Sequence, residues 1–160
     1  MEFKILEEAF SNLSDIERGH LRFTPVFGYG SKKDLMKYLR LERKQGETYY
    51  PLVWLMTPLK VEGDFFKTGN SKVEVDLILA TLTNRDISNQ ERVRLTFEKT
   101  LEPLLEDVVK QLRFGNQVGI YENERFEIEK FFNYDTDGSN AVSDVWDAIT
   151  LRCITKIKYC

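Results

Sequence analysis

An acidic stretch near the C-terminus holds the residues whose types and spacing come closest to a metal-binding loop. The segment NYDTDGSNAVSDVWDAITLRC, residues 133–153, carries four aspartates around a glycine: Asp135, Asp137, Asp144 and Asp147. Carboxylate oxygens at alternate positions are the ligands that calcium takes at positions 1, 3 and 5 of an EF-hand loop. The first two aspartates have this spacing.

The later positions of the stretch are wrong for calcium. If Asp135 is position 1, Asn140 falls at position 6, where glycine must turn the chain, and Trp146 falls at position 12, where a bidentate glutamate is required. Asp, Gly, Ser and Asn are also the residues that form polar turns. We therefore expect no specific metal site, with Asp135 and Asp137 in an exposed loop.

The segment GYGSKKDL, residues 28–35, has features of a second kind of site, an anion-binding site. Glycines before a helix N-terminus, together with Lys32 and Lys33, have the parts of a phosphate site. The P-loop and dinucleotide motifs are both absent from this segment. A glycine turn followed by a Ser31 helix cap explains the same residues, and we favour that interpretation.

Nucleophilic catalysis has few residues to draw on in this chain. His20 is the only histidine, and the surrounding RGHLRF matches no catalytic motif. Cys153 and Cys160 are the only cysteines and lie seven residues apart in one expected strand, so they cannot bridge each other without a sharp reversal. We expect no catalytic residue, no cofactor and no metal, and hence a protein that is not an enzyme.

Composition favours an ordinary globular domain. The chain has 160 residues, of which 42% are hydrophobic and 31% charged, and its formal net charge of −3 gives no general signal for nucleic-acid binding. The first residues lack the cationic start and apolar core of a signal peptide, and no apolar run approaches the roughly 20 residues that span a bilayer. We expect one domain in a reducing compartment, away from membranes.

Hydrophobic periodicity predicts a single α+β domain over residues 1–160. The expected sheet is mainly antiparallel and flanked by helices, with one long helix between two pairs of strands. The expected helices cover residues 2–18, 31–45 and 88–113, and the expected strands cover residues 50–57, 71–83, 124–134 and 145–159. Pro103 lacks a backbone N–H, so we expect a kink or break in the long helix near Glu102.

The strand expected at residues 71–83 carries the clearest pattern. Val73, Val75, Leu77 and Leu79 alternate on one face, while the other face begins polar at Lys72 and turns apolar from Ile78. One end of the strand should therefore be half exposed and the other covered on both sides. The predicted core contains Trp54, Leu77, Leu79, Phe97, Leu101 and Leu151.

The last two expected strands should be antiparallel neighbours joined by the acidic stretch. Alternation places Phe126, Ile128, Phe132 and Tyr134 on one face of the first of them. Trp146, at the end of the acidic stretch, should be an anchor, either in the core or against a neighbouring subunit.

Two adjacent phenylalanines lie in the connection before the clearest strand. Gly63 and Gly69 flank the segment that contains the two phenylalanines and Lys67, and these glycines permit turns at its ends. In an extended segment Phe65 and Phe66 point to opposite sides, so both cannot enter the same core face. Either one of them folds back onto the core, or residues 60–70 form a projecting hairpin whose Phe65, Phe66 and Lys67 contact a partner.

Four blocks in a fixed order together resemble small phage and prophage proteins of the neck and tail, of the tail-terminator or tail-completion type. The blocks are FGYGSKKDLMKYL, YYPLVWLMTP, RVRLTFEKTLEPLLEDVV and SDVWDAITLRC, and together they extend over most of the chain, as far as Cys153. It implies an α+β fold and a non-enzymatic structural protein that forms a ring at the neck or the head-proximal end of the tail. No catalytic motif is carried over.

The resemblance also implies partners and a location. The partners are identical subunits in the ring, the tail tube and the neck or connector proteins; the genome passes through the ring without sequence-specific contacts, and no membrane is involved. The protein would be made in the host cytoplasm and become part of the virion. The acidic loop with Asp135 and Asp137 would face the ring lumen or another subunit, and Trp146 would be an anchor in the core or against a neighbouring subunit.

Two other classes of function remain open from the sequence. One is a small nucleotide- or anion-handling enzyme that uses Lys32, Lys33 and scattered carboxylates in a concave pocket. The other is an adaptor module in a non-viral complex. The absence of catalytic motifs favours the ring protein and the adaptor over the enzyme.

Overall fold

The computed structural model has the predicted α+β architecture. It describes residues 1–40, 50–63, 69–84, 86–121, 124–134 and 144–159. The helices are α1 (Glu2–Ser11), α2 (Lys32–Arg40), α4 (Asn89–Arg92), η1 (Val93–Leu101) and α5 (Glu102–Phe114). The strands are β1 (Ile16–Arg18), β2 (Leu21–Phe23), β3 (Val26–Gly30), β4 (Leu52–Met56), β5 (Lys60–Glu62), β6 (Asn70–Asn84), β7 (Val118–Ile120), β8 (Glu127–Phe131) and β9 (Asp144–Lys158).

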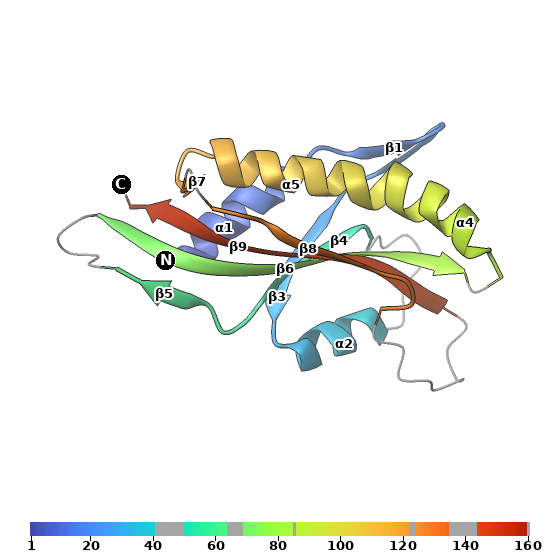
Figure 1. The fold of residues 1–160 in the computed structure, drawn as a ribbon, viewed down its shortest axis with the longest axis horizontal. Coiled ribbons are helices and arrows are strands. Elements are labelled where there is room, and N and C mark those ends of the chain that lie inside the picture. The colour runs from blue at the N-terminus through green and yellow to red at the C-terminus, as the bar shows by residue number, and fades with distance from the viewer. Residues whose placement is uncertain (41–49, 64–68, 85, 122–123, 135–143, 160) are drawn as a thin grey trace.

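A mixed sheet forms the middle layer. Within the described residues it has seven strands in the order β3-β4-β6-β9-β7, with β5 added beside β6 and β8 beside β9. The pair β3–β4 is parallel and the other pairs are antiparallel, so the prediction of a mainly antiparallel sheet holds apart from this one edge. Helix α1 and the long α4–η1–α5 helix cover one face, called here the helix face, and α2 lies on the other, called the α2 face (Figure 1).

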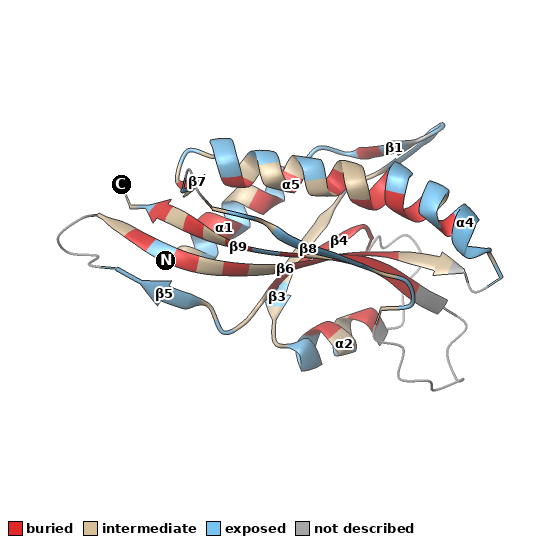
Figure 2. Cartoon of the chain, in the orientation of Figure 1, coloured by how far each residue is buried: buried red, intermediate tan, exposed pale blue. Residues whose placement is uncertain are grey.

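The central strands β6 and β9 confirm the predicted alternation. Val73, Val75, Leu77 and Leu79 are fully buried on the helix face, where they pack with Ile149 and Leu151 of β9. On the α2 face, Ile78, Ala80 and Leu82 belong to a second cluster with Trp54, Trp146 and the α2 residues Leu35 and Leu39. All six predicted core residues are buried, with Trp54 in this second cluster (Figure 2).

The long helix is continuous through Pro103, and no break occurs there. Ser88 caps its start, because its Oγ accepts a hydrogen bond from the backbone N–H of Glu91 at 3.3 Å. The segment η1 has π-helical pairing, and the N–H of Glu102 bonds to the carbonyl of Phe97, five residues back. Pro103 then lies in the first turn of α5, where a missing N–H costs little. A change of hydrogen-bond register replaces the expected break.

The first helix is shorter than predicted. It ends at Ser11 instead of residue 18, and the chain turns into the β1–β2 hairpin. Side chains compete with the helix at this point, since Asn12 Nδ2 donates to the carbonyl of Glu8 at 2.9 Å and Asp107 accepts from the N–H of Ser14 at 2.6 Å. The second helix starts one residue after the predicted cap; the end expected at residues 41–45 lies outside the described residues.

Strands β8 and β9 are antiparallel neighbours, as predicted. Strand β8 is shorter than the expected 124–134, and the shared face predicted for its aromatic residues is wrong at Tyr134. Phe132 contacts Phe97 on the helix face, whereas Tyr134 packs with Phe131 and the α2-face cluster. Asn133 lies between them with φ of 52°, and this left-handed residue breaks the alternation.

In the part of the chain that the structure describes, no helix has the length and apolarity needed to cross a membrane.

Candidate interaction surface

The predicted hairpin at residues 60–70 has a well-defined base. Strand β5 pairs with β6 in the register Lys60↔Glu74 to Glu62↔Lys72, and Lys60 Nζ lies 3.2 Å from Glu74 Oε2. Gly63 and Gly69 have positive φ values of 145° and 61°, so the chain turns where the glycines predicted it. Phe65, Phe66 and Lys67 lie outside the described residues, and their contact with a partner stays a prediction.

The hairpin base is tied to both ends of the described chain. The backbone N–H of Tyr159 donates to the carbonyl of Gly69 at 2.9 Å, and its hydroxyl donates to Glu2 Oε1 at 2.5 Å. Because this donation uses the hydroxyl proton of Tyr159, Ser71 Oγ is the donor in the 2.5 Å contact with it. Burial and the Glu2 bond raise the pKa of Tyr159, and the same bond lowers the pKa of Glu2. The hairpin thus leaves the domain from a fixed base.

Beyond α2, no described element covers the α2 face, and this charged surface is called here the open sheet face. It is made by Lys60, Glu62, Lys72, Glu74, Asp76, Glu127, Glu129, Arg152, Ile154 and Lys156. A shallow cleft of 520 Å³ lies near the hairpin between Lys72, Lys156 and Tyr121, and another of 350 Å³ lies nearer α2, beside Asp76 and Glu129.

The charges on the open sheet face are sorted along the strands. Lys72 and Lys156 lie directly opposite each other on β6 and β9 near the hairpin. Toward α2, Arg152 lies 3.2 Å from Asp76 and 3.9 Å from Glu127, and Asp76 raises the pKa of the Arg152 guanidinium. Like charges directly across a strand pair are unfavourable. Glu62 lies opposite Lys72 on its other side, but Lys156 faces Gly119 there, so Lys156 favours an acidic partner.

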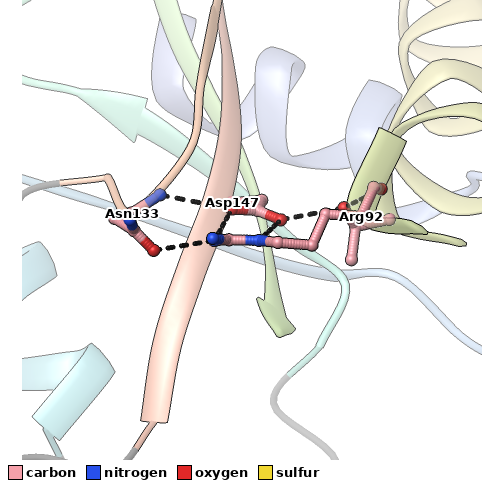
Figure 3. A network of polar contacts seen from close by, with 4 residues as sticks. Arg92, Asn133 and Asp147 are labelled. Carbon is pink, nitrogen blue, oxygen red and sulfur yellow. Dashed lines mark hydrogen bonds and ion pairs between the residues drawn. The ribbon is translucent and has the colours of Figure 1, made fainter. Parts of the chain in front are cut away.

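A buried polar cluster joins the long helix to β9, and Figure 3 shows its geometry. Arg92 is 3% exposed and Asp147 is 0% exposed. Asp147 Oδ2 accepts from Arg92 Nε at 3.1 Å and from Thr96 Oγ1 at 2.9 Å, and Oδ1 accepts from Arg92 Nη2. Asn133 completes the cluster, since its N–H donates to Asp147 and its Oδ1 accepts from Arg92 at 2.8 Å.

The cluster holds two points of the acidic stretch. Asn133 is its first residue and Asp147 comes after three of its four aspartates, and both are held by Arg92. Asp135 and Asp137 themselves lie outside the described residues. Among the residues that the structure describes, no group of three or more His, Cys, Asp or Glu side chains could hold a metal ion.

Trp146 is an anchor in the core. It is 6% exposed in the α2-face cluster, and its Nε1 donates to the hydroxyl of Tyr50 at 2.5 Å. Of the two places expected for it, the structure places it in the core, so this side chain presents little surface to another subunit.

In the segment weighed as an anion site, Ser31 and Asp34 bond to each other, as the favoured helix cap requires. Ser31 Oγ accepts from the N–H of Asp34 at 3.2 Å and donates to Asp34 Oδ2 at 2.6 Å, while the N–H of Ser31 donates to the same oxygen at 2.9 Å. These bonds to Ser31 lower the pKa of Asp34. A carboxylate of the chain itself therefore occupies the helix start, which confirms the cap and leaves no free place for an anion.

The two glycines of the same segment serve packing. A Cβ at Gly28 would lie 2.7 Å from the Trp54 ring, and Trp54 Nε1 donates to the carbonyl of Gly30 at 3.2 Å. The glycines let the indole lie flat against β3.

The remaining nucleophilic candidates are placed away from any catalytic partner in the described residues. His20 lies exposed in the turn between β1 and β2. Cys153 is buried on the helix face, and burial raises the pKa of its thiol to about 12. A thiol with so high a pKa is a poor nucleophile.

Sequence reasoning missed the Arg92–Asp147 cluster. It also missed the hydrogen bonds of Tyr159 to Gly69, Ser71 and Glu2, called here the Tyr159 tie. The sequence did carry a signal for the Arg92–Asp147 cluster. Asp147 lies an even number of residues from Ile149, Leu151 and Cys153, so in a strand it points to the same, buried face. A buried carboxylate requires a partner, and Arg92 stands among the first residues of the facing helix. No comparable signal marks Tyr159.

Comparison with known proteins gives the chain no family assignment: no family model matches the sequence, and no curated protein matches it.

Proposed function

We propose that this chain is a structural protein of a tailed-phage particle, which forms a ring in the neck or at the head-proximal end of the tail. The proposal rests first on the resemblance of its four sequence blocks, which extend from β3 through β9. The α+β architecture agrees with the fold that the resemblance implies. A ring subunit works by contacts with copies of itself and with the tail tube. It therefore needs interaction surfaces and no catalytic site.

The observation that carries the proposal furthest is the hairpin base at the end of the sheet. Figure 1 shows β5 and the start of β6 beyond the end of the helical layer, next to both termini. Strand β6 has 15 residues, which corresponds to roughly 50 Å of chain. The hydrogen bonds of Tyr159 fix the base of the hairpin at the end of this strand, which suits an arm that reaches a neighbour.

The open sheet face supports the same function. Its sorted charges offer a cationic end at Lys72 and Lys156 and an acidic end at Glu127 and Glu129. Such a face gives orientation and selectivity to a protein–protein contact more than it gives affinity. The enzyme alternative loses support because Asp34 occupies the place of the anion.

Assembly of hairpin variants tests the proposal. The double variant Phe65→Ser/Phe66→Ser should fold like the wild type by circular dichroism and thermal melting. It should fail to form the rings that the wild type forms, alone or on tail tubes, in electron micrographs. Burial of one phenylalanine contributes roughly 1.5–3 kcal/mol, and a ring repeats this contribution in every subunit.

Ile128→Ser is the matched control, because Ile128 is 43% exposed on β8 at a distance from the hairpin in sequence. Its rings should persist. If the phenylalanine double variant unfolds, the pair belongs to the core; if it folds and assembles fully, the hairpin is not the interface. If the wild-type protein never associates with itself or with tail tubes, the proposed ring function is wrong.

A further inference from the structure

Strand β3 is an unprotected edge of the main sheet. Exposed edges in natural proteins are usually very short or carry charges or proline, which prevents pairing with another chain. Strand β7, at the opposite end of the strand order, has only three residues, and the β8 sequence EIEKF contains three charges. Strand β3 has five residues, VFGYG, with no charge and no proline.

The outer side of β3 carries backbone groups without partners. The N–H of Val26 donates to the carbonyl of Pro51 at 2.9 Å, and the carbonyl of Gly30 accepts from the N–H of Thr57 at 3.0 Å. The backbone groups of residues 26, 28 and 30 therefore point to β4, and those of Phe27 and Tyr29 point outward. In the described part of the chain, no hydrogen bond reaches these outward groups.

The two outward residues are symmetric about Gly28. In an antiparallel pair, residues that exchange both backbone bonds alternate with residues that exchange none. If Gly28 lies opposite Gly28 of a second copy, Phe27 faces Tyr29 of that copy and Tyr29 faces its Phe27. All the outward N–H and C=O groups are then paired. The closest approach falls at the glycines, where the lack of a Cβ leaves room for it.

The side chains on the helix face agree with this register. Phe27 and Tyr29 both point to the helix face, where Phe10 and Phe3 of α1 lie over them, with ring centroids at 5.6 Å and 5.2 Å. Helix α1 thus follows the edge strand. Tyr29 is 51% exposed and Phe3 is 36% exposed. A twofold axis through Gly28 would place Tyr29 opposite Phe27 of the second copy and cover this aromatic edge.

We propose that β3 pairs antiparallel with β3 of a second copy of this chain, about a twofold axis at Gly28, and joins the two sheets into one. The occupant is a second copy because the edge is self-complementary in backbone polarity, glycine position and aromatic pairing. The contact is isologous and closes on itself. It does not rest on the proposed ring, whose contacts need another surface.

The experiment combines oligomeric state with amide exchange on the full chain. Sedimentation over a range of concentrations should show a species of twice the 18.8 kDa monomer mass. Hydrogen exchange read by mass spectrometry should show protection of Phe27 and Tyr29 that rises with protein concentration. The amides of β8, another strand with an open side, should show no such rise.

Tyr29→Pro and Tyr29→Ser form a matched pair of variants. The proline removes an outward N–H and leaves the bonds to β4 intact, whereas serine removes the ring and keeps the N–H. Because the twofold doubles each loss, Tyr29→Pro should raise the dimer Kd by at least about tenfold over Tyr29→Ser.

Three results would overturn the pairing. They are a wild type that is monomeric at all concentrations, a dimer whose Kd is the same in Tyr29→Pro and Tyr29→Ser, and protection of β8 in place of β3. If Tyr29→Pro fails to fold, amide exchange on the wild type decides. Protection at β3 that appears only when an unrelated extended peptide is added would also contradict pairing between copies.

Discussion

Asp147 shows at the residue scale how a charge can be kept inside this fold. Its carboxylate is fully buried, yet it accepts hydrogen bonds from Arg92, Thr96 and the backbone of Asn133. Removal of one member of such a pair leaves the other charge buried and unpaired, which costs more than the intact pair contributes.

Asp147→Ala should therefore lower the free energy of unfolding by about 3–5 kcal/mol. Asp76→Ala is the matched control, because its partner Arg152 is exposed; it should cost less than about 1 kcal/mol. Urea unfolding followed by circular dichroism measures both. Equal losses in the two variants would mean that Arg92 regains water when its partner is removed.

Cys153 gives a pH-dependent prediction. Burial raises the pKa of its thiol from the ordinary value of 9.0 to about 12, so the thiolate is disfavoured in the folded protein. The stability from this group is fully present below pH 9.0, where folded and unfolded thiols are both protonated, and is lost as the pH rises toward 12. In a Cys160→Ser background, native Cys153 should resist iodoacetamide at pH 8 and react in urea. Rapid labelling of the native protein would show that the site opens.

At the scale of elements, β3 and β4 illustrate a packing device that sequence motifs can obscure. The glycines at 28 and 30 resemble part of a phosphate-binding motif, but they make room for the Trp54 ring. The reason for Gly28 is therefore the size of Trp54, its cross-strand neighbour, whereas a Cβ at Gly30 would meet both Asp34 and Trp54.

Gly28→Ala should destabilise the protein by about 1–3 kcal/mol, because its Cβ would lie 2.7 Å from the indole. Gly119→Ala in β7 is the matched control, since a Cβ there meets nothing within 4 Å. Thermal melting compares the two. A Gly28→Ala protein that melts with the control would show that Trp54 can shift at little cost.

The elements that the sequence predicted best are those with long, regular patterns. The alternation along β6 placed both faces of the strand correctly because the helix face is apolar from Val73 to Leu79. Strand β7 escaped prediction because three residues carry no detectable period. The π-helical pairing of η1 escaped because it depends on packing against β9 through Arg92 and Thr96, which local sequence does not encode.

Candidate site residues were harder to predict than the fold. The turn at Gly63 and Gly69 and the Ser31 cap followed from local backbone chemistry. The Tyr159 tie joins residues 2, 71 and 159, and contacts between such distant positions leave no mark on any local pattern.

At the scale of the whole molecule, one sheet serves two cores. Leu79 faces the helix-face cluster and Ile78, its neighbour in β6, faces the α2 cluster. Because the same strands line both clusters, neither can be lost while the other stays intact.

Leu79→Ala and Ile78→Ala should each lower stability by about 2–5 kcal/mol. Each should shift a single unfolding transition that far-ultraviolet and near-ultraviolet circular dichroism report at the same urea concentration. Val61→Ala is the control, with Val61 46% exposed, and should cost less than about 0.5 kcal/mol. Two separate transitions in Ile78→Ala would show that the α2 layer unfolds independently.

The ladder between β6 and β9 also gives the molecule a direction of mechanical strength. The strands pair without interruption from Asn70↔Lys158 to Asn84↔Asp144, and their hydrogen bonds run perpendicular to the strands. Tension that slides one strand along the other loads the whole ladder at once, so many bonds must break together. A force that separates the strands at one end loads only the outermost pair, and the ladder opens one pair at a time. A neighbour bound to the hairpin therefore meets high resistance when it pulls parallel to the strands. It meets low resistance when it pulls perpendicular to them, because the pairs then open one after another.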